Sequence, residues 1–221
     1  MSKRDILKEI QERKSRLTVQ PSWTIYVDRL VAIMSLLTHM EDSKVEQDTR
    51  TEIGRYIPIA TIAALEGFFK LWIKELIDKG DPFLSHCGGL EFKVDNESII
   101  NMARNQLTLG DFIAHTITIN KLSDVDSIFT TLVLGKDSKQ RYIDLLRTLH
   151  DKAGKKGDFD NDLKKVNLCF DKRHIFAHEI ANAESVSPDE VKGYFVATAM
   201  FCVYSANYLE KLLEDHVKKS V

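Results

Sequence analysis

The longest helical pattern in the sequence covers residues 49–83, TRTEIGRYIPIATIAALEGFFKLWIKELIDKGDPF. Gly80 followed by Pro82 supplies a stop signal at its end, since glycine closes helices and proline cannot continue them. Pro58 is expected to start or kink the helix, because proline has no amide hydrogen and its ring clashes with the preceding turn. The run predicts one long helix in an all-α protein.

Helical patterns continue on both sides of this run. Alternation of apolar and polar residues with a period of two is nearly absent, which argues against β-strands and predicts an all-α chain. Three pairs of residues have capping-box spacing, in which a hydroxyl and a carboxylate three residues later bind each other's backbone amides. The expected helices are residues 2–17, from 22 onward, 98–105, 108–116, 123–134, 137–152, 159–181 and 188–218, and the capping pairs are Thr108 with Asp111, Ser123 with Asp126 and Ser187 with Glu190.

Composition indicates an ordinary soluble protein. The 221 residues are 43% hydrophobic and 29% charged, and no stretch approaches the roughly 18 uninterrupted apolar residues typical of a membrane span. We therefore expect a cytoplasmic protein without a membrane partner. Three widely separated cysteines, Cys87, Cys169 and Cys202, indicate neither a disulfide framework nor a thiolate zinc site.

Charge is balanced overall but uneven along the chain. The formal net charge of −2 argues against a general electrostatic nucleic-acid binder. Lysines nevertheless concentrate in the segment before residue 173. This cluster is either a solvated face or a phosphate-binding surface, and its members include Lys155, Lys156, Lys164, Lys165 and Lys172.

The segment CFDKRHIFAHE, Cys169–Glu179, places an arginine and two histidines in a helix that otherwise has a buried pattern. At about 100° per residue, Arg173 falls near the middle of an apolar sector roughly 140° wide. His174 and His178 share a neighbouring stripe with Asn167. Burying charged or hydrogen-bonding groups such as these costs free energy unless they have hydrogen-bond or ion-pair partners.

Three interpretations compete for this segment. Arg173 could pair with a buried carboxylate such as Glu66 while the histidines bind backbone carbonyls. His174 and His178 could share a zinc ion, although the segment lacks the H-E-x-x-H order and a third ligand. Alternatively, the arginine could neutralise a phosphate while a histidine moves a proton in phosphodiester chemistry.

Residues 173–178, RHIFAH, have the form R-x-x-x-x-H with a polar residue after the arginine, which resembles the motif of the HEPN family. The ALEGFFKLWIKELI helix and the late motif helix of about 159–181, followed by the capped helix 188–218, also resemble that family. The resemblance implies one HEPN-like bundle of antiparallel helices over residues 1–221. Residues 1–43 and 84–135 are not explained by it and are expected to be a helical extension and a helical insertion.

The resemblance implies a metal-independent endoribonuclease that needs no cofactor and works as a homodimer. His178 would move the proton of an RNA 2′-hydroxyl, Arg173 would stabilise the phosphorane, and His174 would orient the phosphate or His178. Glu66 and Asn167 would support them, and the lysine cluster would bind RNA. A toxin–antitoxin or anti-phage setting follows, with an inhibitory antitoxin or a sensor protein as partner.

One position departs from a branch of the family, and one alternative stays open. HEPN toxins with a nucleotidyltransferase antitoxin carry a tyrosine two residues after the histidine, whereas this chain has Ile180. Adenylylation at that position is therefore excluded. HEPN domains also serve as non-catalytic RNA-binding or protein-interaction modules, and the sequence is compatible with that function too.

Overall fold

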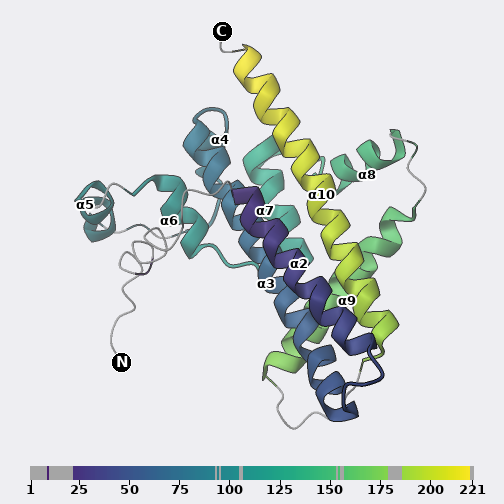
Figure 1. Ribbon diagram of the computed structural model, residues 1–221. Helices are drawn as coiled ribbons and strands as arrows, with labels where there is room; N and C mark the ends of the chain where they lie inside the picture. The colour runs from purple at the N-terminus through teal and green to yellow at the C-terminus, as the bar shows by residue number, and fades with distance from the viewer. Residues whose placement is uncertain are drawn as a thin grey trace. The chain divides into compact units, whose positions relative to one another are not determined.

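The structure is a computed structural model that describes residues 9, 22–92, 94, 96–104, 107–152, 154, 157–178 and 186–219. None of these residues forms a β-strand, and every regular element among them is a helix (Figure 1). The all-α prediction is therefore confirmed. The helices are α2 (Ser22–Glu41), α3 (Gln47–Lys79), α4 (Phe83–Cys87), α5 (Asn96–Arg104), α6 (Leu109–Thr116), α7 (Leu122–Leu134), α8 (Tyr142–Lys152), α9 (Phe159–His178) and α10 (Pro188–Lys219).

The chain is organised as two compact units. Unit 1 contains residues 69–119 and 123–145, and unit 2 contains residues 23–68, residues 120–122 and the chain from residue 146 to the end of α10. Helices α3 and α8 therefore contribute to both units. The expected insertion, residues 84–135, lies in unit 1 apart from residues 120–122, and the expectation of a single domain stays a prediction.

Two capping boxes form as the sequence predicts. The Thr108 hydroxyl accepts a hydrogen bond from the Asp111 amide at 3.0 Å, and the Asp111 carboxylate accepts one from the Thr108 amide at 3.1 Å. At the start of α10, the Ser187 hydroxyl accepts from the Glu190 amide at 3.3 Å, and the Glu190 carboxylate accepts from the Ser187 amide at 2.9 Å. Both boxes satisfy amides that a helix start leaves without intrahelical partners.

The third predicted capping box is wrong. Helix α7 begins one residue before Ser123, so this serine lies in the first turn instead of preceding it. The Asp126 carboxylate accepts hydrogen bonds from Arg141 Nε at 2.8 Å and from the Ile143 amide at 2.9 Å. Asp126 therefore holds the start of α8, which begins five residues after the predicted Asp137.

Pro58 lies inside α3, so it does not start the helix, and the alternative that it kinks the helix stays a prediction. The helix begins at Gln47, and Pro58 is buried in its interior. Packing of the neighbouring residues outweighs the proline penalty here, since Ile57 and Ile62 are 1% and 0% exposed. Burial of one face of a long helix stabilises it more than intrinsic propensity does.

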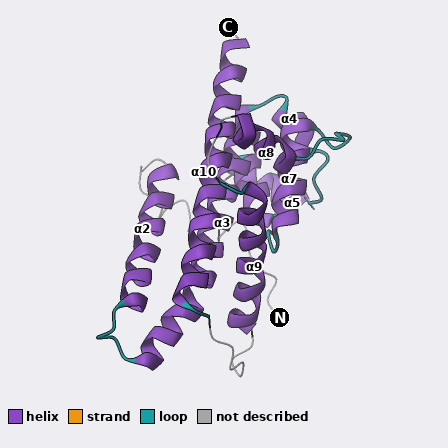
Figure 2. Cartoon of the chain, turned by 90° about the vertical axis from the view of Figure 1, so that its right-hand side faces the viewer, coloured by secondary structure: helices purple, strands orange, loops and turns teal. Residues whose placement is uncertain are grey.

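Helices of unit 2 pack around the first part of α3. Helices α2 and α3 run in opposite directions and are joined by the turn at the lower end of Figure 2. The rings of Tyr26 and Phe68 join α2 to α3 with centroids 4.9 Å apart, and the Lys192 ammonium on α10 contacts the Glu41 carboxylate on α2 at 3.0 Å. Apolar contacts and one exposed ion pair thus fix α2 against its neighbours.

Helix α3 is long and apolar enough to cross a membrane by length and composition alone. Within the part that passes this test, 56% of the residues are buried inside the protein. The core helix of a soluble protein has the same property, so α3 is only weak evidence for a membrane span. No other described helix passes the test.

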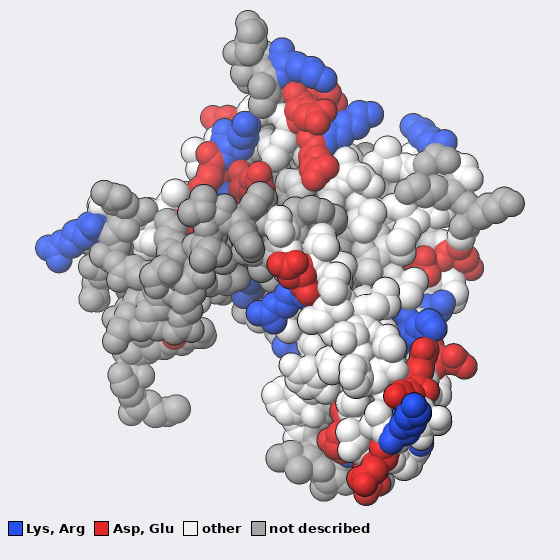
Figure 3. Space-filling view, viewed as in Figure 1, with Lys and Arg blue, Asp and Glu red and all other residues white. Residues whose placement is uncertain are grey.

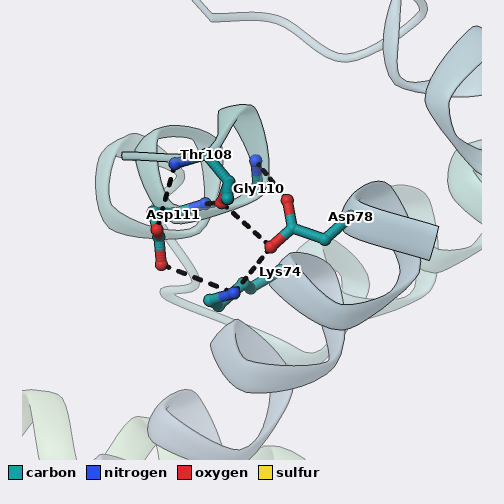
Figure 4. A network of polar contacts seen from close by, with 5 residues as sticks. All are labelled: Lys74, Asp78, Thr108, Gly110 and Asp111. Atoms are coloured by element: carbon teal, nitrogen blue, oxygen red, sulfur yellow. Dashed lines mark hydrogen bonds and ion pairs between the residues drawn. The ribbon is translucent and has the colours of Figure 1, made fainter. Parts of the chain in front are cut away.

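A polar network joins α3 to α6 within unit 1 (Figure 4). The Asp78 carboxylate accepts hydrogen bonds from the Gly110 amide at 3.2 Å, the Thr108 hydroxyl at 2.9 Å and the Lys74 ammonium at 2.6 Å. Lys74 also contacts Asp111 at 3.6 Å. Burial alone would lower the pKa of Lys74. The hydrogen bond to Asp78 and the negative charge of Asp111 outweigh burial, so the pKa of Lys74 is raised above its ordinary value.

Gly110 permits this close approach. A Cβ at that position would lie 2.5 Å from Asp78 Oδ1 and 2.6 Å from the backbone oxygen of Lys74. Contacts this short between a Cβ and an oxygen atom are essentially never seen in proteins, so α6 needs glycine at this position to pack on α3 in this way. A carboxylate at a helix start is also favoured by the helix dipole.

Candidate active site

The motif helix α9 anchors itself through a buried apolar face. Leu163, Val166, Cys169 and Phe170 are at most 8% exposed, and the Cys169 thiol points at the Pro58 backbone oxygen on α3 at 3.9 Å. Burial raises the pKa of the Cys169 thiol to about 12, so the residue is an apolar filler of the core and no nucleophile. Packing on this face fixes the direction in which the last turns of α9 project.

Arg173 pairs with Glu66 of α3. The Arg173 Nη2 atom donates a hydrogen bond to Glu66 Oε1 at 3.0 Å, and the two side chains are 26% and 22% exposed. The sequence suggested this partner, but the pair is partly open to solvent instead of buried. The contact holds the guanidinium at the α3 side of α9, where part of the Arg173 side chain stays open to solvent.

His174 and His178 form an exposed pair on the last two turns of α9. Their ring centroids are 5.1 Å apart with planes inclined at 58°. Both residues are exposed, as is Asn167 on the same stripe of the helix. The second interpretation needs a third metal ligand, and the described part of the chain holds no group of three histidine, cysteine or acidic side chains that could bind a metal.

Sequence reasoning overlooked Asp171 on the histidine stripe. Residues 167, 171, 174 and 178 follow one another at spacings of four, three and four, which places them on one face of a helix. Asp171 is exposed and brings a carboxylate to the same face as the two imidazoles. The spacing alone would have revealed it, since the signal is the same one that groups Asn167 with the histidines.

Arg173 and His178 lie on different sides of α9. Five residues at about 100° each separate them by roughly 140° around the helix axis. Arg173 faces α3, whereas His178 is exposed on the histidine stripe. One copy of the helix therefore presents the two groups in different directions.

Of the described lysines, Lys165 and Lys172 do not join the histidine stripe, whereas Lys164, three residues before Asn167, falls on it by helical spacing. Lys164 is exposed, while the side chain of Lys165 passes close to Gly193 on α10 and the charge of Lys172 acts on Glu190 of the same helix. Lys165 and Lys172 are therefore turned toward α10. Among the described residues on the face in Figure 3, basic side chains are interspersed with acidic ones and form no continuous positive patch.

Some predicted positions lie outside the described residues. These are Lys155 and Lys156 of the lysine cluster, Ile180 after the motif, the first expected helix up to Leu17 apart from Glu9, and the last expected residue of the motif helix, Ala181. Comparison of the chain with protein-family models, curated proteins and solved structures finds no match. The site must therefore be judged on its own geometry.

Proposed function

We propose that this protein is a metal-independent endoribonuclease of the HEPN type, folded as an HEPN-like bundle of antiparallel helices. The observation that carries the proposal is that the last two turns of α9 hold Arg173, hydrogen-bonded to Glu66, on one side and the exposed imidazoles of His174 and His178 on another. Anion stabilisation and proton transfer are the two effects that attack by a 2′-hydroxyl requires. This reaction needs no cofactor.

The proposed reaction is an internal transfer of the phosphate in RNA. The 2′-oxygen attacks the adjacent phosphorus, so a bond from phosphorus to the 2′-oxygen forms as the bond to the 5′-oxygen breaks. His178 takes the 2′-hydroxyl proton or supplies one to the departing 5′-oxygen. The products are a 2′,3′-cyclic phosphate and a 5′-hydroxyl.

Arg173 offsets the charge that develops on the phosphorane. A guanidinium has five N–H donors, and the hydrogen bond to Glu66 uses one of them. Glu66 therefore fixes the orientation of Arg173 and leaves N–H donors for phosphate oxygens. His174 stands 5.1 Å from His178 between ring centroids, close enough to orient the phosphate or the second imidazole, and Asn167 supports the same stripe.

A homodimer is part of the proposal. The roughly 140° between Arg173 and His178 around α9 separates the charge-stabilising group from the proton-transfer group in one copy. A two-fold axis close to the end of α9 would bring Arg173 of one protomer toward His178 of its partner. Each of the two resulting sites would then be composite.

The proposed setting is a cytoplasmic toxin–antitoxin or anti-phage defence system. An inhibitory antitoxin or a sensor protein would restrain the nuclease, since Ile180 stands where tyrosine would be modified. The lysine cluster would guide RNA. Lys164 is the member best exposed for this role among those described, and Lys165 and Lys172 would act from the α10 side of the helix.

A non-catalytic RNA-binding or protein-interaction module is the second candidate. The observation that favours it is the same Arg173–Glu66 ion pair, because a carboxylate at 3.0 Å cancels much of the positive charge offered to a phosphate. In this case the exposed histidines would be contact residues of the module. Activity measurements separate the two candidates.

The decisive experiment is RNA cleavage by purified protein in EDTA. We expect single-stranded or loop RNA to be cut to products with 2′,3′-cyclic phosphate, and RNA with 2′-O-methyl at the cleaved position to resist. Arg173→Ala and His178→Ala should each lower the cleavage rate by about 10²–10⁴-fold, the effect of a positioned catalytic group. His39→Ala, an exposed histidine on α2, is the matched control and should leave the rate unchanged.

Mixing the two inactive variants tests the composite site. A heterodimer of Arg173→Ala and His178→Ala protomers keeps one site with both groups intact, so mixing should restore part of the activity. Cleavage that requires a divalent ion, or that survives in both single variants with normal circular dichroism, contradicts the nuclease and leaves the interaction module. Absence of recovery on mixing contradicts the composite site alone.

A further inference from the structure

Unit 2 contains a cavity that the proposed nuclease does not use. It has a volume of about 300 Å³ and lies between the second half of α8 and the C-terminal half of α10. Small-ligand sites in proteins range from roughly 300 to 1,000 Å³, so this cavity fits a compact molecule. Its lining residues are Leu146, Leu149, His150, Tyr204, Asn207, Tyr208, Lys211, Leu212 and Asp215.

The walls of the cavity are apolar and aromatic. Leu146 is 1% exposed, and the ring of His150, 5% exposed, packs 5.5 Å from Phe159 and 5.4 Å from Tyr204 between centroids. Burial raises the pKa values of Tyr204 and Tyr208, with the charge of Asp162 adding to the effect at Tyr204. These phenols therefore stay neutral at physiological pH, and the walls suit an uncharged aromatic or branched body.

The rim carries two opposite charges. Lys211 and Asp215 are four residues apart on α10, so their side chains lie on the same face of the helix. Both are exposed, and neither forms an ion pair within 4 Å with any residue that the structure describes. Charged side chains gather on these last turns of α10 (Figure 3).

The two charges select the head group of a ligand. A ligand with only a carboxylate would be attracted by Lys211 but repelled by Asp215. A ligand with only an ammonium would be attracted by Asp215 but repelled by Lys211. A head that carries both charges is complementary to the pair, since opposite potentials then face each other. Asn207, one turn before Lys211, adds an exposed amide that can donate and accept hydrogen bonds.

We propose that the cavity between α8 and α10 binds a small zwitterion with an apolar body, the chemistry of a free aromatic or branched-chain amino acid. The body occupies the space between Leu146, Leu149 and the tyrosine rings. Its carboxylate faces Lys211 and its ammonium faces Asp215. This inference goes beyond the proposed nuclease and does not depend on it.

Titration of the full chain with L-phenylalanine, followed by ligand-observed NMR or calorimetry, tests the site. Phenethylamine lacks the carboxylate, 3-phenylpropionate lacks the ammonium, and glycine lacks the body. We expect L-phenylalanine to bind most tightly and glycine not to bind. Lys211→Met and Asp215→Asn should each weaken L-phenylalanine binding by about two- to fivefold, the range of an exposed ion pair.

A blocking variant checks the location. Leu149→Trp should fill the cavity and abolish binding, and because Leu149 is 40% exposed the larger side chain can be accommodated without unfolding. Leu168→Trp is the control, since Leu168 is 46% exposed on α9 and does not line the cavity. Absence of binding by L-phenylalanine, equal binding of the three phenyl compounds, or unchanged binding in a folded Leu149→Trp variant would overturn the proposal.

Discussion

Replacing Gly110 by alanine tests whether the contact between α6 and α3 depends on the missing side chain. The new methyl group would stand 2.5 Å from Asp78 Oδ1 and 2.6 Å from the Lys74 backbone oxygen. The Asp78 side chain can rotate away, but the Lys74 oxygen belongs to the helix backbone and moves only with α3. Relief of the clash therefore breaks the hydrogen bond from the Gly110 amide to Asp78.

Three contributions set the size of the effect. Overpacking in a close contact costs about 1–3 kcal/mol, and loss of the Asp78 hydrogen bond costs about 0.5–1.5 kcal/mol. Alanine in place of glycine in a helix returns about 0.5–1 kcal/mol. We expect Gly110→Ala to lower the free energy of unfolding by about 2 kcal/mol.

Urea unfolding followed by circular dichroism at 222 nm measures this change. Gly67→Ala is the matched control, because Gly67 lies inside α3 with nothing within 4 Å of the added Cβ, so it should stabilise the protein by about 0.5–1 kcal/mol. The double variant with Asp78→Ala should show a smaller effect of the methyl group, since one of its two clashes is gone. A Gly110→Ala protein as stable as the parent would refute the reasoning.

Two further predictions concern the α10 cap and the thiols. Ser187→Ala should destabilise the protein by about 1 kcal/mol in the same unfolding assay. Hydrogen bonds from the amide and hydroxyl of Ser187 lower the pKa of Glu190. The parent protein should therefore lose this stabilisation as the pH falls through the lowered pKa, below about 4.5, and the Ser187→Ala variant should lose less. Equal stability–pH profiles of the two proteins would contradict the capping box. Burial raises the pKa values of Cys169 and Cys202 to about 12 and also raises the pKa of Cys87. The folded protein should therefore react slowly with a thiol reagent at pH 8, and all three thiols should react in denaturant. Rapid reaction of the folded protein would contradict the burial of the thiols.

Local signals in the sequence predicted two helix caps correctly, because the paired residues of each cap lie within one helical turn. Thr108 with Asp111 and Ser187 with Glu190 form capping boxes that are three residues long, so the spacing alone predicts them. The same spacing failed for Ser123 with Asp126, because Asp126 binds Arg141 and the start of α8 instead. Local spacing does not reveal when a tertiary partner takes a carboxylate away from its cap, as Arg141 and the Ile143 amide do with Asp126 but Lys74 does not with Asp111.

The sequence by itself determined that the chain is helical and that Arg173, His174 and His178 share one helix, because helical periodicity is a property of neighbouring residues. Only the tertiary structure decided which helix Arg173 faces, that Lys165 and Lys172 turn toward α10, and that a cavity lies between α8 and α10. Each depends on how helices distant in sequence pack together. That packing is set by the summed burial of many side chains, which no local spacing records.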